Sequence, residues 1–212
     1  MGTELDTDTL ATTRRSLHAV AELVIAGPQH GRFGTIRLQV TPGGFGGVRL
    51  SLRVEGTTLH HDGGSVPLRG TYRGLAEAAG VEVGLPAGLY TDVTGTDPDE
   101  QVVVDAAAAA HLADCWQRGE EALRLLAPEV TPVLWPEHFD VGITVDQVNY
   151  GVSPGDGYHP SPYAYVGPWT PPQGGFWNAP FGAARPIEQL PDAAAVAEFF
   201  AEGRRLAGGQ GG

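Results

Sequence analysis

The chain has 212 residues, of which 42% are hydrophobic, and this supply of apolar side chains excludes a disordered chain for most of its length. The formal net charge of -12 opposes binding to nucleic acid phosphates or to anionic membranes, so we expect neither as a partner. All 13 basic side chains are arginine. The absence of lysine excludes Schiff-base chemistry and, with it, pyridoxal phosphate as a cofactor.

The cysteine content and the longest apolar segment bear on the cellular compartment. The single cysteine, Cys115, cannot form a disulfide within the chain. Residues 19–26 are the longest aliphatic segment and are too short to span a bilayer. The start of the chain does not combine a basic region, an apolar region and a cleavage site, as a secretory leader does. We therefore expect a cytoplasmic protein.

The first predicted element is a helix at residues 13–26. Its apolar residues follow helical spacing: Leu17, Val20, Ala21 and Val24. Gly27 and Pro28 are expected to end it. Residues 1–12 are polar and acidic, and we expect them to be flexible.

Strands are predicted next. Residues 36–40 and 48–54 alternate apolar and polar side chains, as half-buried strands do. The segment between them, TPGGFGG, has the composition of a turn, which predicts a hairpin. A second turn at 61–64 would join strands at 58–60 and 66–68 to the same antiparallel sheet.

A loop divides the chain into two halves. A short helix is predicted at residues 71–80, and residues 84–101 are rich in Gly, Pro, Thr and Asp, as loops are. This loop is the best internal boundary, between an N-terminal half at 13–83 and a C-terminal half at 102–207.

The C-terminal half supplies the remaining elements. In chain order we expect a helix at 105–126, strands at 133–147 and 148–152, a Pro/Gly/aromatic segment at 153–182, a helix at 192–206 and a flexible tail at 208–212. Both halves run helix first and strands afterwards, which leaves a duplication open. The sequence thus predicts an α+β fold, with antiparallel sheet packed against three main helices, in a single globular domain spanning 1–212.

The segment WPEHFDVGITV holds the first candidate site. On a continuous strand Phe139, Val141, Ile143 and Val145 would face the core, while His138 and Asp140 would face the other way. Aromatic side chains from nearby segments could lie beside this polar strip, because Tyr163 and Tyr165 share a strand face. The candidate ligand-binding residues are Tyr150, Tyr163, Tyr165, Trp169 and Trp177. An apolar surface with a few placed polar groups is typical of a small-molecule site.

Three other interpretations of the same residues remain open, so the sequence does not decide whether the protein is an enzyme. His138 could act as a general acid or base, with Asp140 or Glu137 as the orienting or second carboxylate, or His138, Asp140 and His159 could hold a divalent metal ion such as non-haem iron. In a structural or interaction module, the aromatic residues would simply pack in the core or at an interface.

The polar side chains of the N-terminal strands give a further candidate. Arg37, Arg49 and Arg53 lie on the polar face of adjacent predicted strands, where they could hold a carboxylate or phosphate. Solvated arginines that balance an acidic protein are the alternative.

Three segments carry a resemblance. LWPEHFDVGITV, NYGVSPGDGYHPSPYAYVGPW and FWNAPFGAARP together resemble an actinobacterial family of conserved proteins without assigned function. The layout of the chain is similar to a wider group of bacterial domains of unknown function. This layout comprises an LHAVAELV-like helix, a strand ending in TPGGF, an FD-containing strand, an SPGD-like turn and a PYAYV-like strand. The first resemblance covers mainly residues 133–186, and the second most of the chain. The first resemblance implies that residues 133–186 are the family's signature. Neither resemblance assigns a catalytic residue to this chain.

Overall fold

A computed structural model of the chain describes residues 6–170 and 173–208. The predicted α+β fold is confirmed, and all described strand pairings are antiparallel. The described chain forms two compact units: unit 1 holds the residues up to Asp114 together with Leu134–Phe139, and unit 2 holds the rest. The division between the units therefore falls inside a helix, and residues 84–101 belong wholly to unit 1.

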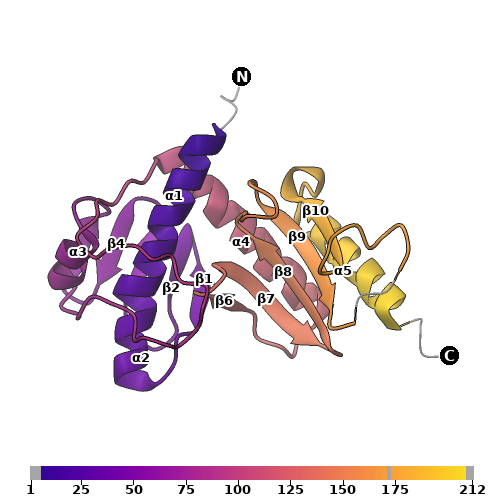
Figure 1. Cartoon of the computed structure of the whole chain (residues 1–212), viewed down its shortest axis with the longest axis horizontal. Helices are drawn as coiled ribbons and strands as arrows, with labels where there is room; N and C mark the ends of the chain where they lie inside the picture. The colour runs from indigo at the N-terminus through magenta and orange to yellow at the C-terminus, as the bar shows by residue number, and fades with distance from the viewer. Residues whose placement is uncertain (1–5, 171–172, 209–212) are drawn as a thin grey trace. The chain divides into compact units, whose positions relative to one another are not determined.

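One long helical segment opens unit 1 (Figure 1). It consists of α1 (Thr7–Val20), the π-helical turn η1 (Ala21–Ala26) and α2 (Gly27–Phe33). The expected stop at Gly27-Pro28 is wrong, because Pro28 lies in the first turn of α2, where a missing N–H is tolerated. The segment ends at Gly34, whose φ of 70° is the left-handed conformation that glycine adopts easily.

The start of this helix revises the expected N-terminal flexibility. Helical structure begins at Thr7, because the side chain of Asp6 caps the first turn by accepting a hydrogen bond from the Thr9 amide. The other residues expected to be flexible, 1–5 and 209–212, lie outside the described part of the chain.

The described part of unit 1 contains six strands in the order β6-β1-β2-β3-β4-β5. Their bounds are β1 (Leu38–Thr41), β2 (Gly44–Gly47), β3 (Arg53–Glu55), β4 (Thr58–His61), β5 (Gly64–Pro67) and β6 (Val133–Trp135). The β4–β5 turn was predicted correctly. The glycine-rich segment GFGG, expected to be part of a turn, is itself the strand β2. A Cβ atom at Gly44 would lie only 2.2 Å from the carbonyl oxygen of Val54, so glycine here permits close strand approach.

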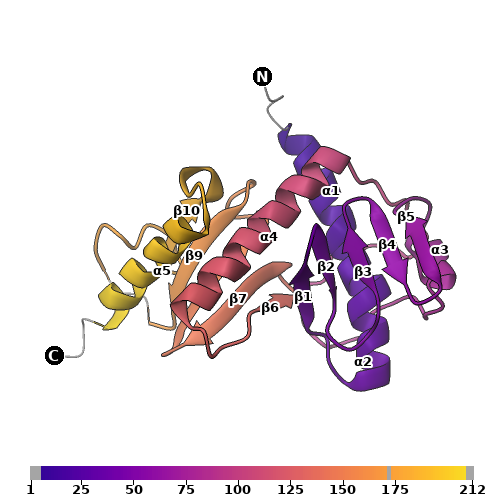
Figure 2. The same cartoon turned by 180° about the vertical axis from the view of Figure 1, so that it is seen from behind.

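The two faces of this sheet differ. Core side chains occupy one face, namely Leu38, Phe45, Val54 and Leu59, and this face packs on the long helical segment. α3 (Tyr72–Ala78) also packs against η1. The opposite face carries polar residues and is turned toward the viewer in Figure 2, with α1 behind it.

The expected strand at 133–147 is interrupted. β6 ends at Trp135, a turn follows at 136–139, and β7 (Asp140–Val145) begins afterwards. The amide of Phe139 donates to the carbonyl of Trp135, and Phe139 has a φ of 55°, which an extended strand cannot contain. His138 and Asp140 are therefore not alternate residues of one strand.

Among its described residues, unit 2 contains four strands in the order β7-β8-β9-β10. The later elements are β8 (Val148–Ser153), β9 (Tyr163–Pro168), β10 (Ala183–Pro186), the 3-10 turn η2 (Ile187–Gln189) and α5 (Ala193–Gly208). β10 was not predicted. The helix predicted at 105–126 is α4 (Ala106–Leu126), which begins in unit 1 and ends in unit 2.

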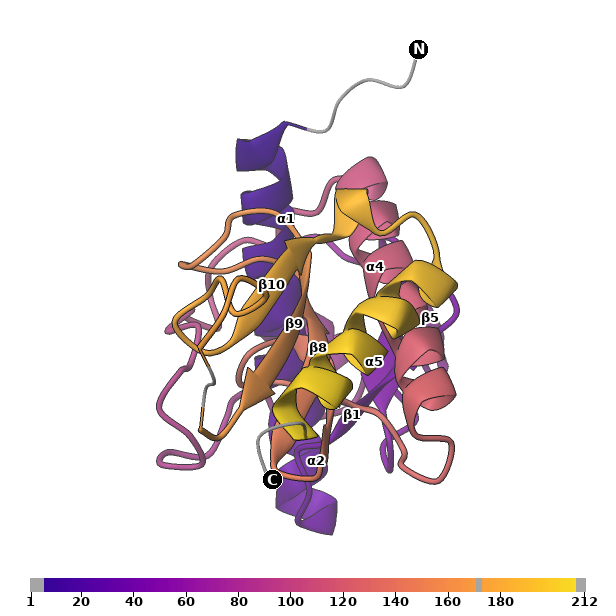
Figure 3. The same ribbon diagram turned by 90° about the vertical axis from the view of Figure 1, so that its right-hand side faces the viewer.

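The C-terminal part of α4 and α5 cover one face of the unit 2 strands (Figure 3). Glycines permit the contact: a Cβ atom at Gly119 of α4 would lie 2.7 Å from Val152, and one at Gly203 of α5 would lie 2.8 Å from Val166. No helix in the described part of the chain is both long and apolar enough to cross a membrane.

Candidate functional site

The strand face of unit 2 that points away from α4 and α5 carries polar and aromatic side chains. Strand pairing places Gly142 opposite Gly151, and Gly151 opposite Tyr165. Paired residues share a face, and so do residues two apart on a strand. Asp140, Tyr163 and Tyr165 therefore lie on this face, while Val141, Val152 and Val166 point toward the helices.

Tyr165 reaches across β8 to β7. Its hydroxyl donates a hydrogen bond to Oδ2 of Asp140, a carboxylate that is 6% exposed. The path is open because Gly142 and Gly151 have no side chains: a Cβ atom at Gly151 would lie 2.5 Å from the Tyr165 hydroxyl oxygen. Burial, followed by the negative charge of Asp140, raises the pKa of Tyr165 well above its ordinary value, so the phenol stays protonated as a donor.

Tyr163 is held by a second carboxylate. Its hydroxyl donates to Oδ2 of Asp156 at 2.5 Å, and Oδ1 of Asp156 accepts from the amides of Tyr158 and His159 at 2.8 and 3.1 Å. One aspartate thus fixes both the turn after β8 and a side chain on β9. Burial and then Asp156 raise the pKa of Tyr163, which also keeps this hydroxyl protonated.

Aromatic rings surround these two tyrosines. The Tyr158 ring centroid lies 5.0 Å from that of Phe181 and 5.7 Å from that of Tyr163, both edge to face. The rings of Tyr163 and Tyr165 are 6.5 Å apart. Tyr158 is 45% exposed. We call this surface the polar-aromatic face; it comprises Asp140, Asp156, Tyr158, Tyr163, Tyr165 and Phe181.

The other proposed ligand-binding residues lie elsewhere. Tyr150 points to the helix-covered face, is fully buried and packs edge to face on Phe200 of α5. Burial raises its pKa to about 12. Trp169 follows β9 and is 67% exposed, and Trp177 packs edge to face on Phe176. The structure therefore brings Tyr163 and Tyr165 together and leaves Tyr150 in the core.

The two candidate histidines have separate surroundings. His138 lies in the turn before β7 and belongs to unit 1, whereas Asp140 belongs to unit 2. The imidazole of His138 is 3.9 Å from Asp92 and 3.7 Å from Glu137. Nδ1 of His159 lies 2.8 Å from the carbonyl of Ser161. Within residues 6–170 and 173–208, no group of three or more His, Cys, Asp or Glu side chains is placed to hold a metal ion.

A buried carboxylate in unit 1 was not singled out in the sequence. Glu22 lies on the π-helical turn η1, is 1% exposed, and accepts hydrogen bonds from the Tyr90 hydroxyl, the Thr94 amide and the Thr94 hydroxyl. Burial, followed by the charge of Glu22, raises the pKa of Tyr90. The signal that could have identified Glu22 is a single acid inside the otherwise aliphatic segment 19–26. These bonds fasten the loop at 84–101 to the long helical segment.

His18 lies one helical turn before Glu22. Its ring stacks on Phe139, with centroids 5.0 Å apart and planes inclined by 5°, and Nε2 lies against the carbonyl of Pro136. Burial lowers the pKa of His18, while Glu22, 3.8 Å away, opposes that shift with a smaller effect. The neutral imidazole is thus part of the unit 1 core.

Comparison with protein-family models, with curated proteins and with solved structures found no match to this chain.

Proposed function

We propose that the polar-aromatic face binds a small organic molecule with a flat ring. The observation that carries this proposal is the grouping of Tyr158, Tyr163, Tyr165 and Phe181 on the strand face that α4 and α5 do not cover. Tyr158 is the exposed ring of this group, and it offers a ligand a stacking surface that is backed by Tyr163 and Phe181.

Charge restricts the class of molecule. The polar members of the face are the carboxylates of Asp140 and Asp156 and the hydroxyls that they orient. Carboxylates repel an anion, and the faces of aromatic rings attract cations. We therefore expect a neutral or cationic ring system. We expect neither nucleic acid nor an anionic membrane as a partner, because the net charge is -12. We also propose that this binding takes place in the cytoplasm, as expected from the sequence.

A titration with two small probes tests the proposal. Indole supplies a neutral planar ring and benzamidine a planar cation, and backbone amide chemical shifts report where each binds. We expect the shifts to change in β9, at residues 156–159 and at Phe181. Tyr158→Ala removes an exposed ring and should weaken binding about tenfold, which corresponds to about 1.4 kcal/mol.

The matched control removes an exposed aromatic ring from unit 1. Phe33 is 43% exposed, and Phe33→Ala should leave probe binding unchanged. The proposal fails if neither probe shifts these amides, or if both substitutions weaken binding equally. Independently of the two probes, native mass spectrometry of the protein purified from its own host would reveal a retained small molecule.

A further inference from the structure

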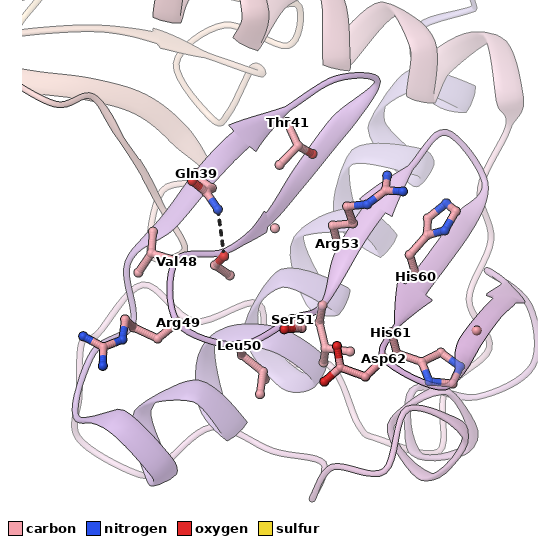
Figure 4. A pocket seen from close by; sticks show the side chains of 14 residues that line it. Gln39, Thr41, Val48, Arg49, Leu50, Ser51, Arg53, His60, His61 and Asp62 are labelled. Carbon is pink, nitrogen blue, oxygen red and sulfur yellow. Dashed lines mark hydrogen bonds between the residues drawn. The ribbon is translucent and has the colours of Figure 1, made fainter.

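The uncovered face of the unit 1 sheet contains a groove of about 520 Å³ (Figure 4). Its lining is polar and rich in groups that can carry positive charge, namely Arg49, Arg53, His60 and His61. Asp62 is the carboxylate that lines it. In a chain with a net charge of -12, such a concentration of basic groups calls for an explanation.

Strand pairing builds the centre of the groove. Arg53 on β3 pairs directly with His60 on β4, and Arg53 also pairs with Gly46 on β2. Figure 4 shows the guanidinium of Arg53 and the ring of His60 projecting side by side from neighbouring strands. Gly46 leaves the surface next to Arg53 without a side chain, and a Cβ atom there would lie 2.9 Å from Cβ of Arg53. Gly46 therefore permits β2 and β3 to lie close together beside Arg53.

A buried amide fixes one wall. Gln29 of α2 is fully buried, and its side-chain oxygen accepts hydrogen bonds from the amides of Arg49 and Leu50 at 2.8 and 3.2 Å. The guanidinium of Arg49 lies 5.6 Å from the ring centroid of Phe33. The segment between β2 and β3, which forms this wall, thus has a defined position.

The guanidinium of Arg53 is oriented by Glu55, but not all of its N–H groups donate hydrogen bonds to described residues. Nη1 donates to Oε2 of Glu55 at 2.6 Å, and no other hydrogen bond joins this guanidinium to a described residue. His60 Nε2 lies 3.4 Å from the same carboxylate oxygen. Nε and Nη2 of Arg53 remain available as donors. Thr41 also lines the groove, and its buried hydroxyl has no hydrogen-bond partner among the described residues.

We propose that this groove binds a small organic anion through a carboxylate or phosphate group. Two parallel N–H donors of a guanidinium match the spacing of two oxygens in either group. A long polyanion would meet the repulsive charge of the whole molecule, whereas a small one is screened from distant carboxylates, because the Debye length is about 8 Å at physiological ionic strength. Arg53 supplies two parallel N–H donors, and His60 on the neighbouring strand supplies an adjacent donor.

Calorimetric titration with inorganic phosphate and, separately, with malonate tests this inference and separates the two anion classes. We expect one or both anions to bind, and Arg53→Gln to weaken that binding at least about tenfold, because a charge-assisted bidentate contact is lost. His60→Gln should weaken it by a smaller factor. Arg53 is largely exposed, so the substitution leaves the core intact, and equal thermal melting of variant and wild type would verify this.

The control makes the same charge change outside the groove. Arg69 is exposed and does not line it, so Arg69→Gln should bind the anions as the wild type does. If neither anion binds at millimolar concentration, or if the Arg53 and Arg69 variants bind equally, the inference is overturned. Because the polar-aromatic face lies in unit 2, this result is independent of the function proposed for that face.

Discussion

The hydroxyl of Tyr165 on β9 donates a hydrogen bond to the carboxylate of Asp140 on β7, and the side chain passes over β8 between them. The cross-strand pair Gly142 and Gly151 makes this reach possible, because any side chain at Gly151 would occupy the position of the phenol oxygen. One hydrogen bond therefore links the first and third strands of unit 2.

Removing that hydroxyl should destabilise the protein. Tyr165→Phe leaves a carboxylate that is 6% exposed without this donor, and we expect the free energy of unfolding to fall by about 1–3 kcal/mol. Urea denaturation measures the change. Tyr158→Phe is the control, since Tyr158 is 45% exposed, and it should change the free energy by less than about 0.5 kcal/mol. Equal effects of the two substitutions would contradict a stabilising role for the Tyr165–Asp140 bond.

Acid pH should destabilise the protein partly through His18. Burial lowers the pKa of this imidazole in the folded state, so the unfolded state binds the proton more readily. The stabilisation that neutral His18 contributes is complete at pH values above 6.5, the ordinary pKa of histidine. This stabilisation is lost progressively as the pH falls below 6.5. Urea denaturation at a series of pH values should show a decline in the free energy of unfolding in this range.

Substitution isolates the histidine. His18→Phe preserves a ring that can stack on Phe139 and removes the titrating group, so the decline should become shallower. His61→Gln, which removes one histidine at the end of β4, is the matched comparison for the loss of an imidazole. An unchanged slope in His18→Phe would show that other groups cause the acid sensitivity.

Two helical glycines should respond to alanine with opposite signs. Gly119→Ala would place a methyl group 2.7 Å from Val152, so α4 must move away from the strands, and we expect a loss of about 1–3 kcal/mol in the free energy of unfolding. A Cβ atom at Gly31 in α2 would meet no atom within 4 Å. Gly31→Ala should thus stabilise the protein by up to about 1 kcal/mol, since alanine favours helix. Thermal or urea unfolding of both variants measures these changes. An unchanged free energy of unfolding in Gly119→Ala would contradict tight packing between α4 and the strands.

Local sequence patterns predicted the helices better than the strands. The 3.6-residue period is visible within one segment, and α4 and α5 lie close to the predicted ranges 105–126 and 192–206. The predicted element boundaries were wrong where tertiary contacts determine where a helix or strand ends. The helical segment continues through Gly27, with Pro28 in the first turn of α2, and GFGG extends as β2 because β3 approaches its glycines. Neither outcome can be read from neighbouring residues.

Part of the candidate site followed from strand alternation. The shared face of Tyr163 and Tyr165 depends only on their spacing, and the structure shows it. The side on which Tyr150 lies depends on its pairing with Val166 across β8 and β9, which local alternation does not specify. Asp156 and Phe181 come from loops whose path is set by contacts distant in the chain, so the sequence alone did not group them with the tyrosines.

The route of the chain through the two units has a consequence for biosynthesis. The chain leaves unit 1 at Asp114, inside α4, and returns for Leu134–Phe139 before it enters unit 2 for the last time. That returning segment supplies Leu134, which pairs with Leu38 on β1, and Phe139, which packs between His18 and Phe45. A nascent chain emerging from the ribosome cannot complete unit 1 until it has also delivered residues 115–133. No single cut in the chain separates the units, so isolating either one requires removing the interposed segment of the other and rejoining the chain.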